Sequence, residues 1–261
     1  MHPCRPRQVI DVHSHVGVSA EYPWFGTGDF ARVLDRAAAV GVNISILSHV
    51  NPLWDSARYW KSANLKLLRE CDRRKDALMW WVVDPRSPRS IDLFKNHAAH
   101  PKVVGMKIGP TYHHYRFTHY ARTVFELAAQ TGKAIITHCG QANDMPAAMI
   151  PWANRYPHVR FIMSHFGNCL GYQGHLKAMI RCSSPACFVD TSSAVSMNCD
   201  FIERGVRRLG AQRFFFGTDT PFYSVAAQQA RILEADLAPD EKKAILGDNA
   251  RRYLLRDDLQ T

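Results

Sequence analysis

The most constraining feature of this sequence is its regular alternation of strand-like and helix-like segments. Eight segments are rich in β-branched or aromatic residues and are bounded by turn formers, as strands are. They cover residues 9–16, 44–50, 77–84, 103–109, 134–140, 160–167, 187–193 and 213–220. Helical patterns fill the gaps, for example "DFARVLDRAAAVG" (29–41) and "ARTVFELAAQTG" (121–132). Each of these two ends in a glycine, which is typical of a helix C-terminus.

This alternation predicts one fold. Strands that alternate with helices pair in parallel through right-handed crossovers. Eight such units in 261 residues predict a single (β/α)8 barrel domain over residues 1–261. The alternative is a doubly wound open sheet, which usually carries a glycine-rich phosphate loop after its first strand. Here "HSHVGVSAEYP" stands at that place, so we favour the barrel.

The first predicted strand, "VIDVHSHV", is unusually polar for a buried segment. Because side chains alternate between the two faces of a strand, Asp11, His13 and His15 are expected on one face. The other face would pack against helices through apolar residues, namely Ile10, Val12 and Val16. The polar face then needs hydrogen-bond partners or a metal.

Three other predicted strands end with groups of the same kind. The fifth, sixth and eighth end with His138, His165 and Asp219. In a (β/α)8 barrel the carboxyl ends of the strands meet at one mouth, where the active site lies. Neutral imidazoles and a carboxylate suit a divalent metal such as zinc. The alternative is a set of unrelated core histidines, and the shared position of these residues favours the metal site.

The motifs around these residues resemble a known family. They are "DVHSHVG" (11–17), "THCG" (137–140), "SHFG" (164–167), "FFGTDTPF" (215–222) and the C-terminal "ILGDNARRYLL" (245–255). In this order they resemble the amidohydrolase superfamily, in particular its amidohydrolase 2 branch, which includes aminocarboxymuconate semialdehyde decarboxylase. The resemblance implies an enzyme with one divalent metal, for which we expect zinc, with manganese as the alternative.

The resemblance also implies roles for individual residues. The implied metal ligands are His13, His15, His138 and Asp219. His165 becomes the general acid or base near the metal-bound water, a role suited to an imidazole. Asp219 could also move a proton. Asp11 is expected either to orient a ligand histidine through a hydrogen bond or to bind neighbouring backbone.

Basic residues near the predicted mouth could bind substrate. The alternating pattern of the fourth strand turns Lys107 inward. A lysine on this strand is carbamylated and bridges two metals in some members of the superfamily, whereas nuclease-like members carry a glutamate. Uncarbamylated, Lys107 could bind a substrate carboxylate, which we favour, or form a salt bridge inside the barrel. Arg116 and Arg86, in neighbouring loops, could clamp a carboxylate or be ordinary surface residues. Trp24 and Trp54 could wall the pocket or pack a lid.

Charge and composition restrict the partners. Lysine and arginine number 33 and acidic residues 23, which gives a net charge of +10. The basic residues are scattered and form no stripe interleaved with aromatics, so we expect no nucleic-acid partner and a small anionic substrate instead. No apolar run approaches the roughly 20 residues of a membrane span, and "MHPCRPRQ" lacks the apolar core of a secretory signal. We expect a cytoplasmic location and no membrane partner, and we consider a homodimer.

Two enzymatic functions fit these features. The first, which we favour, is a metal-dependent hydrolase, in which a metal-activated water attacks an amide, ester or lactone of a small anionic substrate. The alternative is a metal-dependent decarboxylase, a lyase that acts on an aromatic or unsaturated carboxylic acid without oxidation. Both use the same ligands, so the ligand set does not separate them. A carboxylate-binding cation over the metal, in an aromatic pocket, would favour decarboxylation. A non-catalytic binding protein is a third interpretation, disfavoured by the intact ligand set.

Overall fold

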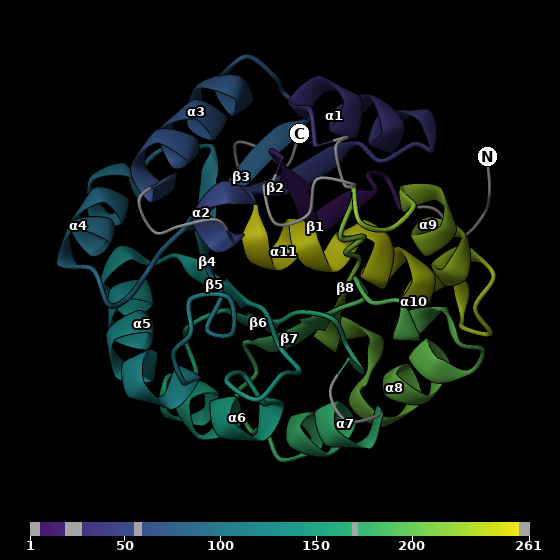
Figure 1. Cartoon of the computed structure of the whole chain (residues 1–261). Helices are drawn as coiled ribbons and strands as arrows, with labels where there is room; N and C mark the ends of the chain where they lie inside the picture. Colours follow the sequence, from purple (N-terminus) through teal and green to yellow (C-terminus); the bar gives the residue numbers. More distant parts are fainter. Residues whose placement is uncertain (1–5, 19–27, 55–58, 169–171, 256–261) are drawn as a thin grey trace.

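The eight strands form one parallel sheet. The computed structural model describes residues 6–18, 28–54, 59–168 and 172–255. The sheet order follows the chain from β1 to β8 (Figure 1). The strands are β1 (Ile10–Val16), β2 (Ile44–His49), β3 (Ala77–Val82), β4 (Val103–Ile108), β5 (Ala134–Thr137), β6 (Phe161–Met163), β7 (Cys187–Asp190) and β8 (Phe214–Phe215). The N–H of Val12 donates to the carbonyl of Phe216 (2.9 Å), and the N–H of Asp219 donates to that of His13 (2.7 Å). These bonds join β1 to the β8 segment and confirm the predicted barrel.

The helices are α1 (Phe30–Ala39), α2 (Asn51–Trp54), α3 (Trp60–Asp72), α4 (Pro88–His97), α5 (Phe117–Thr131), α6 (Pro146–Arg155), α7 (Tyr172–Ile180), α8 (Phe201–Leu209), α9 (Val225–Leu233), α10 (Pro239–Lys243) and α11 (Asn249–Leu254). Most of them surround the strands in a ring, whereas α11 crosses the barrel (Figure 1). Gly132 directly follows α5 and ends the helix, as the sequence predicted. Its φ of +65° is left-handed, a conformation that favours glycine. Within the described ranges, every helix is too short or too polar to cross a bilayer.

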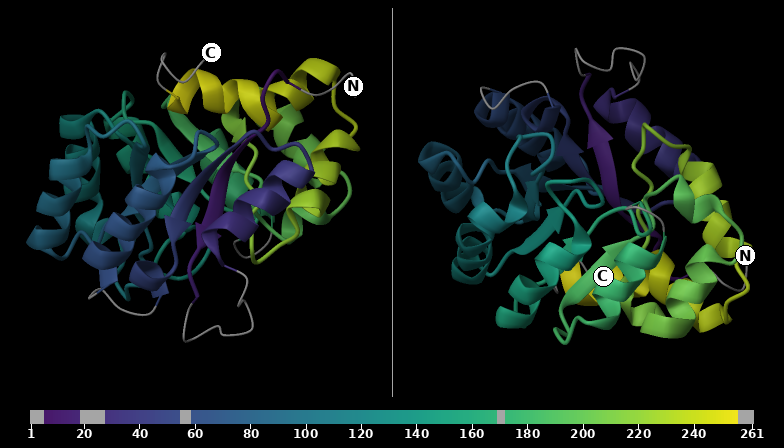
Figure 2. Two further views of the ribbon diagram at one scale, coloured as in Figure 1. Left: turned by 90° about the horizontal axis from the view of Figure 1, so that it is seen from above. Right: turned by 60° about the horizontal axis from the view of Figure 1, so that its bottom comes forward.

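The strands are buried on both sides, which is why they read as nearly continuous apolar runs. Inside the barrel, Trp80, Ile136 and Phe215 belong to one apolar cluster that also includes Leu254 of α11. Figure 2 shows α11 lying across the end of the barrel opposite to the carboxyl end of β1. The outer faces of the strands pack against the helices in a second, larger cluster. Because α11 covers one end, the carboxyl ends of the strands are left to form the site.

A bulge in β1 changes which side chains face inward. Asp11 pairs with Ser45 of β2 but Ser14 pairs with Leu47, so β1 contains one extra residue between these pairs. The expectation that Val12 packs against helices, together with Ile10, is therefore wrong, because both belong to the interior cluster. The bulge lets Val12 and His13 both face inward, which strict alternation does not allow. The carbonyl of Val12 accepts a hydrogen bond from the Trp80 indole (2.8 Å).

Asp11 does not share the face of His13 and His15, because it precedes the bulge. Its Oδ1 accepts the backbone N–H of His13 (3.0 Å) and that of Thr218 (3.1 Å). Burial raises the pKa of Asp11 to about 7, against the hydrogen bonds of Ser14 and Thr218 that lower it. Of the two roles expected for Asp11, the structure shows the second: it binds backbone and joins β1 to the β8 segment, with no contact to an imidazole ring among its described hydrogen bonds.

Candidate metal centre

His13, His15 and Asp219 meet at the carboxyl ends of β1 and β8. Nε2 of His13 lies 3.1 Å from Nε2 of His15. The Oδ1 atom of Asp219 lies 3.0 Å from Nε2 of His15 and 3.7 Å from Nε2 of His13. Ligand atoms about 2.0–2.2 Å from one ion lie about 2.8–3.6 Å from each other in octahedral or tetrahedral geometry. Two of the three separations fall in this range and the 3.7 Å one lies just above it, so a small shift of these atoms would let them bind one divalent ion.

Hydrogen bonds hold the candidate histidines through Nδ1. The three pairs are His13 with Asp190, His138 with Asp144 and His15 with Ser48, each 2.9 Å long. An imidazole that donates Nδ1–H to a carboxylate keeps its lone pair on Nε2, the atom that then ligates a metal. The arrangement around His13 and His138 therefore fits a metal with no change of tautomer.

His138 lies at the same mouth but outside the close group. It lines a narrow cavity together with His15, His165 and Asp219, and its ring centroid lies 5.0 Å from that of His165. The structure thus brings all four predicted ligands to one mouth and places three of them close to ligand spacing.

The protonation states at the mouth are those a metal needs. Burial, together with the charge of Lys107, lowers the pKa of His13 to about 3, against the opposing effects of Asp190 and Asp219. Burial opposes ionisation of Asp219, but hydrogen bonding to His15 and the charges of nearby histidines outweigh it, and its pKa falls to about 2. Neutral imidazole and ionised carboxylate are the metal-binding forms.

Lys107 points into the barrel beside these residues. Its side chain is 1% exposed, and Nζ donates a hydrogen bond to Nε2 of His13 (2.8 Å). Burial lowers the pKa of Lys107 to about 8, against the opposing charges of Asp190, Asp219 and Asp144. The structure therefore places a buried cation next to the candidate metal ligands.

His165 lies across the mouth from His13, at a ring separation of 4.9 Å. Its φ is +61°, a conformation that residues other than glycine rarely adopt. The backbone N–H donates to Oδ1 of Asp190 (2.9 Å), and the ring Nδ1 lies 2.5 Å from the carbonyl oxygen of Ser192. Because that carbonyl accepts the hydrogen bond from Nδ1–H, Nε2 is the nitrogen that remains to exchange a proton with a molecule in the cavity.

The two arginines do not line this cavity. The Arg86 guanidinium is paired with both carboxylate oxygens of Asp84 (2.9 Å each) and lies over the Tyr115 ring at 5.6 Å. Arg116 is exposed and immediately precedes α5. Neither is among the described residues that line the cavity. The expectation that they clamp a substrate carboxylate beside the ligands is therefore not supported by their positions. Trp24 lies outside the described residues.

Aromatic side chains form the outer wall of the mouth. The Trp54 ring lies 4.7 Å from that of Phe222 and 5.7 Å from that of Tyr112. Tyr112 contacts His138 at 4.9 Å, and Phe222 contacts His15 at 5.5 Å. Trp54 and Tyr112 line a cavity of about 20 Å³, which has room for about one water molecule.

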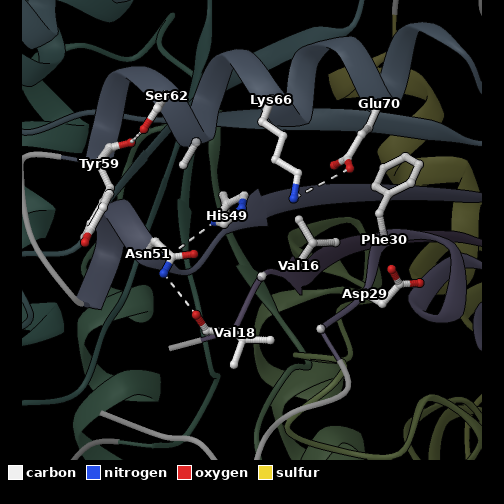
Figure 3. A pocket seen from close by; sticks show the side chains of 13 residues that line it. Val16, Val18, Asp29, Phe30, His49, Asn51, Tyr59, Ser62, Lys66 and Glu70 are labelled. Atoms are coloured by element: carbon white, nitrogen blue, oxygen red, sulfur yellow. Dashed lines mark hydrogen bonds and ion pairs between the residues drawn. The ribbon is translucent and has the colours of Figure 1, made fainter. Parts of the chain in front are cut away.

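A larger cavity of about 600 Å³ lies beside the mouth, between α1, α3 and the carboxyl ends of β1 and β2 (Figure 3). Its imidazole is His49, whose Nδ1 accepts the backbone N–H of Asn51 (3.3 Å). Lys66 and Glu70 of α3 form an ion pair at 4.0 Å along its wall. None of the candidate ligands is among its described lining residues, so its size does not make it the metal centre.

Three supporting residues were missed by the sequence reasoning, namely Asp190, Asp144 and Ser48. Asp190 ends β7 in the way that the candidate ligands end their strands, so the same strand-end criterion points to it. Asp144 lies in a loop and Ser48 is one of many serines. Nothing in the sequence pattern distinguishes these two.

Comparison with known proteins identifies the family. The family model described as Amidohydrolase matches residues 10–256, and the chain belongs to this family, as its motifs indicated. The sequence has no significant match among curated proteins.

Solved structures share the fold. The chain is similar to 5-carboxyvanillate decarboxylase from Sphingomonas paucimobilis, with a TM-score of 0.76, 14% identity and coverage of 95% of this chain and 98% of that one. It is similar to a dihydroxybenzoic acid decarboxylase from Polaromonas sp. JS666, described with bound manganese and the inhibitor 2-nitroresorcinol (TM-score 0.74, 14% identity, coverage 95% and 96%). Amidohydrolase 2 from Bifidobacterium longum subsp. infantis is 18% identical, with a TM-score of 0.68 and coverage of 95% and 98%.

Proposed function

We propose that this protein is a metal-dependent decarboxylase that removes carbon dioxide from a small aromatic carboxylic acid without oxidation. The observation that carries the proposal is the buried Lys107 ammonium next to the candidate metal ligands, in a mouth with aromatic walls. Hydrolysis, which the sequence favoured, requires no carboxylate-binding cation at the reacting centre. Structural neighbours named as decarboxylases of aromatic acids also support the proposal.

Lys107 binds the substrate carboxylate in this proposal. Its ammonium is buried, where negative charge stabilises a cation. Among its described contacts, the direct hydrogen bond goes to neutral His13, and Asp190, Asp219 and Asp144 act through their charge. Nε2 of His13, which accepts the Lys107 hydrogen bond (2.8 Å), has a single lone pair and serves one partner at a time. A metal on that nitrogen would release the ammonium to an anionic substrate.

The aromatic wall orients the ring of the substrate. Trp54, Tyr112 and Phe222 contact one another or the ligand histidines at ring separations of 4.7–5.7 Å, the range of favourable aromatic contacts. The 20 Å³ cavity is too small for a ring, so substrate entry requires these side chains to move apart. Their return would exclude water from the reacting carbon.

The reaction breaks the bond between the ring and the carboxyl carbon, carbon dioxide leaves, and the ring carbon takes a proton. His165 supplies that proton from Nε2 when its ring is the imidazolium, with Nδ1–H held by the Ser192 carbonyl, and it returns to the neutral Nδ1–H form. Asp219 also lines the cavity and is the second group able to carry a proton. A divalent ion held by His13, His15, His138 and Asp219 would supply Lewis-acid stabilisation of the negative charge that develops.

The test is a screen of the protein loaded with Mn²⁺, and in parallel with Zn²⁺, against aromatic carboxylic acids and matched esters, amides and lactones. Carbon dioxide and newly formed acid are both recorded. We expect carbon dioxide from at least one aromatic acid, and its loss in the His165→Asn variant, which controls for contaminating enzymes. Acid released from an ester, amide or lactone, with no carbon dioxide from any substrate, would contradict the proposal.

A further inference from the structure

We propose that Asp190 and Ser192, at the end of β7, position two groups at once: the metal ligand His13 and the proton-transfer residue His165. This inference rests on the metal centre and on the role of His165 in the proposed function. It assigns to β7, which supplies no ligand itself, the task of fixing the position of the ligand His13 relative to that of the proton-transfer residue His165.

Asp190 uses both carboxylate oxygens. It is fully buried. Oδ2 accepts the Nδ1 proton of His13 (2.9 Å), and Oδ1 accepts the backbone N–H of His165 (2.9 Å) and that of Ser192 (3.0 Å). One rigid side chain thereby ties together β1, the segment after β6 and the segment after β7.

Ser192 completes the connection. Its hydroxyl donates to Oδ1 of Asp190. The hydroxyl oxygen lies 2.8 Å from Nδ1 of His13 and 3.0 Å from Nδ1 of His165. Because its only proton is committed to Asp190, this oxygen can only accept from the two imidazoles. Both rings must then carry their proton on Nδ1, and both present Nε2 to the mouth.

The same two residues hold His165 in its unusual backbone conformation. A left-handed non-glycine residue persists only where its surroundings fix it. For His165 (φ +61°) the surroundings are the Asp190 oxygen on its N–H and the Ser192 carbonyl on its ring. Loss of Asp190 would free the backbone and move the imidazole.

Asp144 provides a matched control within the same site. It holds His138 through Nδ1 at 2.9 Å, as Asp190 holds His13. Its other oxygen accepts the N–H of Gln141 (2.7 Å) in its own loop. Asp144 thus supports one imidazole and has no described hydrogen bond to His165.

The central variant is Asp190→Asn. A carboxylate only accepts hydrogen bonds, whereas an amide has one accepting oxygen and one donating NH₂ group. The NH₂ group must face either His13 or the two backbone N–H groups. In either orientation, the hydrogen bonds on that side of residue 190 are lost. An amide donor facing Nδ1 would force His13 into the Nε2–H tautomer, which does not ligate. We expect the dissociation constant for Mn²⁺ to rise about 10–100-fold. At saturating Mn²⁺, we expect turnover to be lower by a further ~10²-fold from the displaced His165.

Asp144→Asn should weaken Mn²⁺ binding similarly, and it is the matched control for the position of His165, to which Asp144 has no described hydrogen bond. Histidine ¹⁵N NMR of the metal-free proteins gives a readout independent of turnover. We expect His13 as the Nδ1–H tautomer in the wild type, and shifted His165 ring signals in Asp190→Asn and Ser192→Ala but not in Asp144→Asn.

Unchanged Mn²⁺ affinity in Asp190→Asn, or unchanged His165 signals, would overturn the inference. The wild-type spectrum tests the inference even if Asp190→Asn does not fold. If His13 is the Nε2–H tautomer in the wild type, the inference is overturned. If the affinities and signals change as expected but no substrate releases carbon dioxide, the positioning inference stands and the proposed function fails.

Discussion

Replacing Lys107 by methionine tests the carboxylate-binding role most specifically. The change keeps a side chain of similar length in the barrel and removes the charge. Because Lys107 is 1% exposed, its pairing with a substrate carboxylate would be shielded from water. Truncating one partner of a buried, hydrogen-bonded charge pair costs about 2–5 kcal/mol. At about 1.4 kcal/mol for each factor of ten, KM for an aromatic acid should rise by about 30-fold to about 4,000-fold.

The assay measures KM, kcat and bound metal for Lys107→Met and for a control, Lys102→Met. Nζ of Lys102 donates to the carbonyl of Ala77 (3.1 Å) at the start of β3, at the end of the barrel opposite to the mouth. The control should leave KM unchanged, and metal content should be equal in both variants. An unchanged KM in Lys107→Met would show that Lys107 does not bind the substrate carboxylate. Loss of a second metal, with bicarbonate restoring activity to the metal-free wild type, would instead identify Lys107 as a carbamylated bridge.

Three further outcomes are expected. His165→Asn should retain its metal yet lose turnover by about 10²–10⁴-fold; loss of metal in elemental analysis would make His165 a ligand. Gly217→Ala would place a Cβ 3.0 Å from the Cβ of His13, so calorimetric titration should show weaker Mn²⁺ binding, and an unchanged affinity would mean that the strand yields. Burial opposes ionisation of Glu203, but its ion pair with Arg231 (2.5 Å) lowers its pKa. The stability that this pair contributes is present above the unfolded pKa of about 4.3 and is lost as the pH falls through the lower folded value. Denaturant unfolding should therefore show Glu203→Gln less stable than the wild type by roughly 3–5 kcal/mol at pH 7, with a smaller difference below pH ~4; a constant difference would contradict this.

The barrel and its mouth could be predicted because local patterns determine them. Eight apolar segments separated by helical patterns leave few arrangements, and parallel strands bring their carboxyl ends to one place. For this reason His15, His138, His165 and Asp219 could be gathered at one cavity from the sequence, where the structure places them.

The orientation of β1 could not be predicted, because strict alternation fails at a bulge. The extra residue between Asp11 and Ser14 turns Val12 inward, and Asp11 accepts hydrogen bonds from backbone N–H groups instead of facing the mouth. The partners of the histidines could not be predicted for a second reason. Asp190 and Asp144 reach their imidazoles through tertiary contacts, and a pattern along one segment carries no information about a side chain on another.

Whether this mouth holds one divalent metal is tested most directly by an anomalous diffraction map of Mn²⁺-loaded crystals. We expect one peak among Nε2 of His13, Nε2 of His15 and the carboxylate of Asp219, with His138 completing the ligands, and its loss in Asp219→Ala. A map without a peak, from protein supplied with manganese and zinc, would contradict a metal centre at this mouth, and two peaks bridged at Lys107 would identify a binuclear centre instead.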